Sequence, residues 1–143
     1  MKTRQAIAIT SIMSALTTAV LAGPATSGVV AKVDLGEQAM NIYVDGKLRH
    51  SWSIASGRRG HETPTGSYRP QRLERDWYSR QYDDAPMPYS VFFSGGYAIH
   101  GGYGRMGRPA SHGCIRLTTG NAATFFKLVS SLGAGATRIV IDG

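Results

Sequence analysis

The chain of 143 residues contains a single cysteine, Cys114, and therefore no internal disulfide bond. Cys-x-x-Cys and His-x-x-x-His pairs, in which proteins often present ligands to zinc, are absent from the sequence. A zinc site built from His61, His100, His112 and Cys114 is an alternative that this spacing disfavours. We expect no metal or other cofactor, and a fold held by its hydrophobic core alone.

Charged residues are also absent from residues 6–22, a stretch preceded by Lys2 and Arg4. A short positive segment followed by an uncharged one is typical of a secretory signal peptide. An uncleaved membrane anchor is disfavoured, because the stretch is shorter than the roughly 20 apolar residues that cross a bilayer and is interrupted by Ser and Thr. We therefore expect export to the periplasm or cell envelope.

Small residues at the end of this stretch predict where the signal peptide is cut. We expect residues 1–22 to be the signal peptide and residues 23–28 a short leader, with cleavage after Ala25 as the rival. The remaining chain, residues 29–143, has the length of one compact domain.

Acidic residues are few, 9 against 16 Lys and Arg, and the formal net charge is +7. Two of these positive charges lie in the predicted signal peptide, which leaves +5 for the rest. A basic surface favours an anionic partner, and an exported protein meets anionic wall polymers and lipid headgroups rather than nucleic acid. A solvated basic surface without a partner is an equally good interpretation, and the oligomeric state stays open.

Short β-rich runs separated by turns cover most of the domain. Asp45-Gly46 between two such runs is a strong hairpin signal, and Ser94-Gly95-Gly96 joins two others. We expect strands at 29–35, 40–44, 47–55, 67–73, 89–93, 97–100 and 136–141.

Two further segments differ from this pattern. Residues 74–88 are charged, aromatic and contain prolines, which predicts an irregular loop of the kind that often covers a site. Apolar residues recur at helical spacing between a capping Thr118 or Thr119 and Gly133; they are Ala122, Phe125, Phe126, Val129 and Leu132. The expected fold is mostly β, a single compact β-sandwich-like catalytic domain with one packed C-terminal helix.

The residues around Cys114 suit acyl transfer through a thiol, which needs a thiolate, a base and donors for an oxyanion. Gly113 lets the backbone turn tightly, so that the N–H groups of His112, Gly113 and Cys114 can converge as an oxyanion hole. Arg116 adds positive charge, which is expected to lower the pKa of the thiol and to attract a substrate carboxylate.

Two histidines compete for the role of base. His112 lies two residues from Cys114, whereas His100 ends a predicted strand across a ten-residue loop. Catalytic bases are usually brought by the fold rather than by sequence neighbours, so we assign the base to His100. His112 is given a structural or oxyanion role, and a hydrogen bond that fixes the loop explains it at least as well as proton transfer does.

These residues carry a resemblance to a known family. Ile99-His100-Gly101, followed by the segment 111–117 with sequence Ser-His-Gly-Cys-Ile-Arg-Leu, resembles the signature of the YkuD-type L,D-transpeptidase catalytic domain. Weaker supporting segments are Val33-Asp34-Leu35 with Gln38, Asp45-Gly46-Lys47, Ser56-Gly57, Thr63-Pro64-Thr65-Gly66 and Met87-Pro88-Tyr89. The loop between His100 and Ser111 is shorter than the family usually shows.

The resemblance implies a thioester between Cys114 and the third residue of a peptidoglycan tetrapeptide stem, formed as the terminal D-Ala leaves. It also implies that His100 is the base, oriented by a backbone carbonyl at or near Gly101. The candidate substrate-binding residues are Ser111, Arg116, Gly101 and Tyr89. The expected function is therefore cross-linking or remodelling of the wall, with an amine as acceptor.

Other functions share these residues. A wall hydrolase or carboxypeptidase would use the same cysteine with water as acceptor, and a lipoprotein lysine or a free D-amino acid are further acceptors. A wall-binding module without catalysis is disfavoured because both His100 and Cys114 are retained. A papain-like protease is disfavoured because that family's local signature is absent around Cys114.

Overall fold

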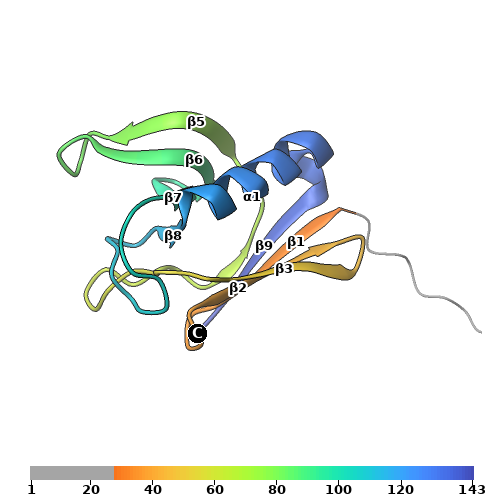
Figure 1. Ribbon diagram of the computed structural model, residues 1–143, viewed down its shortest axis with the longest axis horizontal. Coiled ribbons are helices and arrows are strands. Elements are labelled where there is room, and N and C mark those ends of the chain that lie inside the picture. The colour runs from red at the N-terminus through yellow and green to blue at the C-terminus, as the bar shows by residue number, and fades with distance from the viewer. Residues whose placement is uncertain (1–27) are drawn as a thin grey trace, which may run out of the picture.

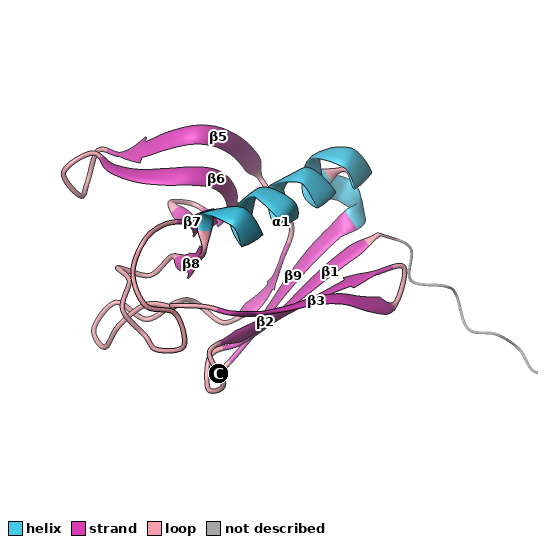
Figure 2. Ribbon diagram, in the orientation of Figure 1, coloured by secondary structure: helices cyan, strands magenta, loops and turns pink. Residues whose placement is uncertain are grey.

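The computed structural model describes residues 28–143, so the predicted signal peptide and the leader up to residue 27 lie outside the described residues. No helix within 28–143 is long and apolar enough to cross a membrane. The predicted fold class is confirmed: two β-sheets and one long helix form the structure (Figures 1 and 2).

The first sheet has five strands in the order β3-β2-β1-β9-β4. The β2–β3 connection is the predicted hairpin, and Asp45 and Gly46 both have positive φ, 50° and 79°, as a type I′ turn requires. The last strand pairs in parallel with the first, which closes the domain. The strands are β1 (Val29–Asp34), β2 (Ala39–Val44), β3 (Lys47–Ser53), β4 (Gly66–Tyr68) and β9 (Thr137–Asp142).

The second sheet has four strands in the order β5-β6-β7-β8. Its first three strands are antiparallel neighbours, whereas β7 and β8 pair in parallel. β8 has only three residues, too few to form a recognisable sequence pattern, and it is defined by its pairing with β7. The strands are β5 (Arg72–Ser79), β6 (Ala85–Ser94), β7 (Tyr97–Gly101) and β8 (Ile115–Leu117).

The predicted helix is α1 (Thr119–Leu132), followed by the 3-10 turn η1 (Ala134–Ala136). Thr118 caps its start, because the Thr118 hydroxyl accepts a hydrogen bond from the Asn121 amide. At the other end Gly133 has φ 95° and its amide donates to Val129. The helix runs between the β5–β6 hairpin and strands β1 and β9 (Figure 1).

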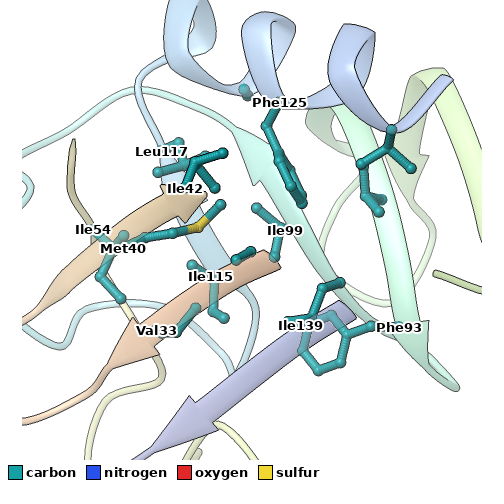
Figure 3. Close-up of a cluster of buried hydrophobic side chains, with 14 of the residues drawn as sticks. Val33, Met40, Ile42, Ile54, Phe93, Ile99, Ile115, Leu117, Phe125 and Ile139 are labelled. Atoms are coloured by element: carbon teal, nitrogen blue, oxygen red, sulfur yellow. The ribbon is translucent and has the colours of Figure 1, made fainter. Parts of the chain in front are cut away.

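One hydrophobic core joins the two sheets and the helix (Figure 3). Ile42 of the first sheet and Ile99 of the second are completely buried, and Phe125 reaches toward them from α1. Truncating a buried Phe to Ala costs about 3–5 kcal/mol, so this junction fixes how the sheets are placed. The side chains of β7 and β8 that pack in this core hold the two strands in place, and the side chains on the opposite face are thereby positioned as well.

Two sequence predictions about the middle of the chain are wrong. The strand expected at 67–73 is two strands, because Pro70 interrupts it and the chain crosses from β4 in one sheet to β5 in the other. The loop expected at 74–88 is mostly the β5–β6 hairpin, with only residues 80–84 as its turn. Polar and aromatic residues on both faces hide the alternation in this segment, since only Met87 among residues 74–88 is buried.

Candidate active site

The parallel pair β7–β8 places the candidate catalytic residues. Ile99 pairs with Ile115 and His100 with Arg116. Successive side chains of a strand point to opposite faces, and Ile99 and Ile115 are fully buried in the core. His100 and Arg116 therefore project from the other face, together with Cys114, which directly precedes β8. This face opens into a cleft that all three residues line.

His100 is held in one orientation by its own strand. Its Nδ1 lies 2.7 Å from the carbonyl oxygen of Gly101, and a bond to a carbonyl requires Nδ1 to carry the proton. Nε2 is then left as an acceptor for the cleft. Burial lowers the pKa of His100; the bond to Gly101 raises it and the charge of Arg116 lowers it further. The imidazole is therefore neutral at neutral pH, as a base must be.

The Cys114 thiol is partly buried, with Sγ 3.8 Å from the carbonyl oxygen of Gly96. Burial raises the pKa of Cys114, and a hydrogen bond from the backbone of Ala98 opposes this. The sequence predicted that Arg116 would lower the thiol pKa; that prediction is wrong, because burial dominates and the positive charge acts on His100 instead. The resting site thus pairs a neutral thiol with a neutral imidazole.

The turn before Cys114 requires glycine. Gly113 has φ 128°, and a Cβ at this position would lie 2.6 Å from Cε1 of Tyr97. The Ser111 hydroxyl donates to the Cys114 carbonyl oxygen at 2.5 Å and accepts from the Gly113 amide at 3.1 Å. The Gly113 amide is therefore occupied, which reduces the predicted oxyanion hole. Among the described residues, no hydrogen-bond partner is found for the amides of His112 and Cys114.

A second layer of buried polar residues supports this turn. The hydroxyl of Thr63 donates to the carbonyl of Gly113 at 2.7 Å and accepts from the amide of Gly57 at 2.9 Å. The side chain of Gln38 bonds to both the hydroxyl and the amide of Ser56. Because these partners are buried, each lost bond leaves an unsatisfied group. Three of the supporting segments, those that contain Gln38, Ser56-Gly57 and Thr63, thus help to position the cysteine turn.

The β5–β6 hairpin forms one wall of the cleft, whose volume is about 970 Å³. Figure 1 shows the hairpin extending beyond β7 and β8. At its tip the ring of Tyr82 stacks on His112 with centroids 3.9 Å apart and planes inclined by 9°. His112 is exposed, and its pKa is lowered first by partial burial and then by Arg58. It lines the cleft, and its ring also makes an edge contact with His61, with centroids 5.4 Å apart. These two ring contacts suit a role in holding the hairpin tip at the cleft.

The four candidate substrate-binding residues do not all reach the cleft. Arg116 lines it, and its buried Nε has no hydrogen-bond partner within residues 28–143. Ser111 lines it too, although its hydroxyl is already engaged in the turn. Gly101 is buried where a Cβ would lie 2.9 Å from Cα of Thr119, so its contribution is the carbonyl that orients His100. Tyr89 packs against Phe126 of α1 and does not line the cleft.

Sequence reasoning missed the cleft residues of the hairpin. Arg72, Trp77, Met87, Phe92 and Tyr82 all line the cleft. Trp77 and Tyr82 lie in the segment predicted as a covering loop, and its aromatic and basic content was their only signal. Met87 belongs to a supporting segment of the family resemblance, and Arg72 and Phe92 lie in predicted strands. No group of three His, Cys, Asp or Glu side chains in the described part of the chain is placed to hold a metal ion.

This arrangement, a thiol and an oriented neutral imidazole that line one cleft, is suited to acyl transfer through a thioester. Residues 28–141 match the family model of YkuD, the L,D-transpeptidase catalytic domain. The chain belongs to this family. A comparison with curated proteins found no match.

Solved L,D-transpeptidases share this fold. The chain is 27% identical to the one from Xylanimonas cellulosilytica, with a TM-score of 0.69, over 81% of this chain and 61% of that one. The chain is 23% identical to the one from Stackebrandtia nassauensis, with a TM-score of 0.73, over 90% of this chain and 62% of that one. It is 21% identical to the one from Mycobacterium smegmatis, with a TM-score of 0.71, over 82% of this chain and 59% of that one. The chain spans about three fifths of these structures.

Proposed function

We propose that the protein is a peptidoglycan L,D-transpeptidase that uses Cys114 as nucleophile and His100 as base. The observation that carries this proposal is the β7–β8 pairing, which puts both side chains on the cleft face of two neighbouring strands. The bond between His100 Nδ1 and Gly101 supports it, because it leaves Nε2 free to accept the thiol proton. The proposed donor is a tetrapeptide stem that ends in D-Ala.

In the first step Nε2 of His100 takes the proton of Cys114 as Sγ attacks the carbonyl carbon of the third stem residue. The negative charge that develops on the carbonyl oxygen is stabilised by the amides of His112 and Cys114. The C–N bond to D-Ala then breaks, and the leaving amine takes the proton from His100. The products are free D-Ala and a thioester on Cys114.

The second step reverses these roles. An acceptor amine attacks the thioester carbonyl, His100 accepts its proton, and the C–S bond breaks to give a new amide and a thiolate that recovers the proton from His100. Because both resting groups are neutral, proton transfer accompanies the attack in each direction. The site therefore suits an exchange between two amides, and this exchange does not require a thiolate that is charged at rest.

The proposed place of action is the cell envelope, which the predicted signal peptide and the basic charge support. The acceptor is proposed to be an amine of another stem. The test is product analysis after incubation of the mature protein with purified tetrapeptide muropeptides, with Cys114→Ala as control. Cross-linked products with release of D-Ala are expected, whereas tripeptide alone would assign the protein as a carboxypeptidase and unchanged substrate would overturn the proposal.

A further inference from the structure

A second arginine of the cleft is held in an unusual way. The guanidinium of Arg72 lies 4.1 Å from the ring centroid of Phe92 and 4.5 Å from that of Trp77. The two rings are themselves in edge contact, with centroids 5.5 Å apart. Contact with aromatic rings holds a guanidinium in place without using its N–H donors. Arg72 is thus held at the cleft while its hydrogen-bonding capacity remains available.

The one salt bridge that Arg72 makes within residues 28–143 does not neutralise it. Glu74 Oε1 lies 3.8 Å from Nη1, and the side chains are 45% and 39% exposed. An exposed ion pair of this length contributes little. No other salt bridge to Arg72 occurs in residues 28–143. A ligand carboxylate can therefore compete for the remaining donors.

The aromatic support of Arg72 also reaches the thiol. Phe92 belongs to a small buried cluster with Met87 and Ala98, and both Trp77 and Cys114 pack against this cluster. Arg72 and Cys114 therefore lie on the same apolar wall of the cleft, and both line it. A peptide whose carbonyl sits at the thiol is in a position to extend along this wall toward Arg72.

The cleft as a whole is cationic. Three arginines line it, Arg72 and Arg80 from the hairpin region and Arg116 from β8, and no Asp or Glu among the described residues does so. Arg72 and Arg116 come from the first and last strands of the four-stranded sheet. A peptide with one carboxylate would leave one of these two guanidinium groups unmatched.

We propose that Arg72 and Arg116 bind two different carboxylates of the donor stem, so that the cleft selects stems whose carboxylates are free over stems in which they are amidated. This inference rests on the proposed function for the identity of the donor. The chemistry is that of a guanidinium donating to a carboxylate. A carboxamide keeps the shape of the group but loses the charge, and therefore binds less tightly.

The experiment measures binding without turnover, in the Cys114→Ala protein. Trp77 reports binding through its fluorescence, because it lines the cleft and the only other tryptophan, Trp52, lies in β3 of the other sheet. Three synthetic tetrapeptides are compared: one with all carboxylates free, one with a C-terminal carboxamide and one with the internal carboxylates amidated. Arg72 is replaced by Gln and by Lys.

Arg72→Gln is expected to raise the dissociation constant of the acid peptide, the one with all carboxylates free, about tenfold, as for the loss of a charge-assisted hydrogen bond. For one of the two amidated peptides, Arg72→Gln is expected to bind almost as tightly as its parent protein. The carboxylate that is amidated in that peptide is then the one that Arg72 binds. Arg72→Lys should keep part of the preference. Arg75→Gln is the matched control, because Arg75 is on the same strand and also stacks on an aromatic ring, that of Tyr89, but does not line the cleft.

Equal affinity of Arg72→Gln and its parent for the acid peptide would overturn the inference, and so would an equal loss for all three peptides, which indicates a structural role. If the acid peptide does not bind at all, this inference fails together with the proposed donor. Binding that depends on Arg72, without D-Ala release by the protein that retains Cys114, would support the inference and overturn the proposed reaction alone.

Discussion

The hydroxyl of Thr63 donates a 2.7 Å hydrogen bond to the carbonyl of Gly113, the residue before the cysteine. The two residues are fifty positions apart in sequence, and the contact is buried. The same hydroxyl accepts from the amide of Gly57, so one side chain ties the segment after β3 to the cysteine turn. The position of the thiol in the cleft depends on this tie.

Thr63→Val should therefore loosen the cysteine turn. The substitution keeps the shape of the side chain but leaves the Gly57 amide and the Gly113 carbonyl without their partner, which costs about 1–3 kcal/mol. Urea unfolding should show this loss, and the acylation rate of Cys114 should fall. Thr65→Val, at an exposed position of the same segment, is the control. An unchanged unfolding free energy for Thr63→Val would contradict the role of this contact.

Replacing each of the two cleft histidines, His100 and His112, should have clearly different effects on the rate of acylation. His100→Ala should slow thioester formation by about 100- to 10,000-fold, the usual effect of removing a general base. His112→Ala should retain most of the rate for bound donor, because His112 contacts Tyr82 at the hairpin tip. Single-turnover acylation, with circular dichroism to check folding, is the measurement. A larger loss for His112→Ala would reverse the assignment.

Part of this structure could be predicted from the sequence because local patterns determine it. The spacing of Ala122, Phe125 and Val129 predicts the buried face of α1, and these three residues are indeed buried. Asp45-Gly46 predicts its hairpin because few other residues adopt a type I′ turn. His100 lies in β7, as the strand predicted at 97–100 indicated.

The remainder depends on tertiary packing. β8 exists because β7 lies beside it, and its three residues carry too short a pattern to be recognised. None of residues 74–86 of the β5–β6 hairpin is buried, so that the sequence of this part resembles a loop. The side chain of Tyr89 could not be placed from sequence for the same reason. Its motif neighbours Met87 and Pro88 line the cleft, but its own ring packs against Phe126.

Tyr82→Ala should detach the hairpin tip from the cysteine turn. An aromatic stack contributes about 0.5–1.5 kcal/mol, which corresponds to about two- to tenfold in an equilibrium constant. We expect KM for the donor to rise by that factor while kcat changes little, and iodoacetamide to reach Cys114 faster. Tyr78→Ala is the control, because Tyr78 is on the same hairpin, is 57% exposed and does not line the cleft. Identical alkylation rates for both variants would count against a hairpin held by this stack.

The pH dependence of acylation should report the environment of His100. Burial, helped by Arg116, holds the pKa of His100 below its usual value of about 6.5. The base is neutral above its pKa, so the acid limb of the rate should lie below that pH. In Arg116→Gln the nearby positive charge is gone, which favours protonation, and the limb should move to higher pH. Single-turnover rates at saturating donor measure this, and a limb that moves to lower pH in the variant would contradict it.

The most direct test of a cysteine transpeptidase site is the mass of the intact protein after brief incubation with a tetrapeptide muropeptide and acid quenching. The account predicts an added mass equal to the donor minus D-Ala, located on Cys114 by peptide mapping and absent in Cys114→Ala. In His100→Ala the adduct should form far more slowly. No adduct on a protein that releases D-Ala, or an adduct on another residue, would contradict the account.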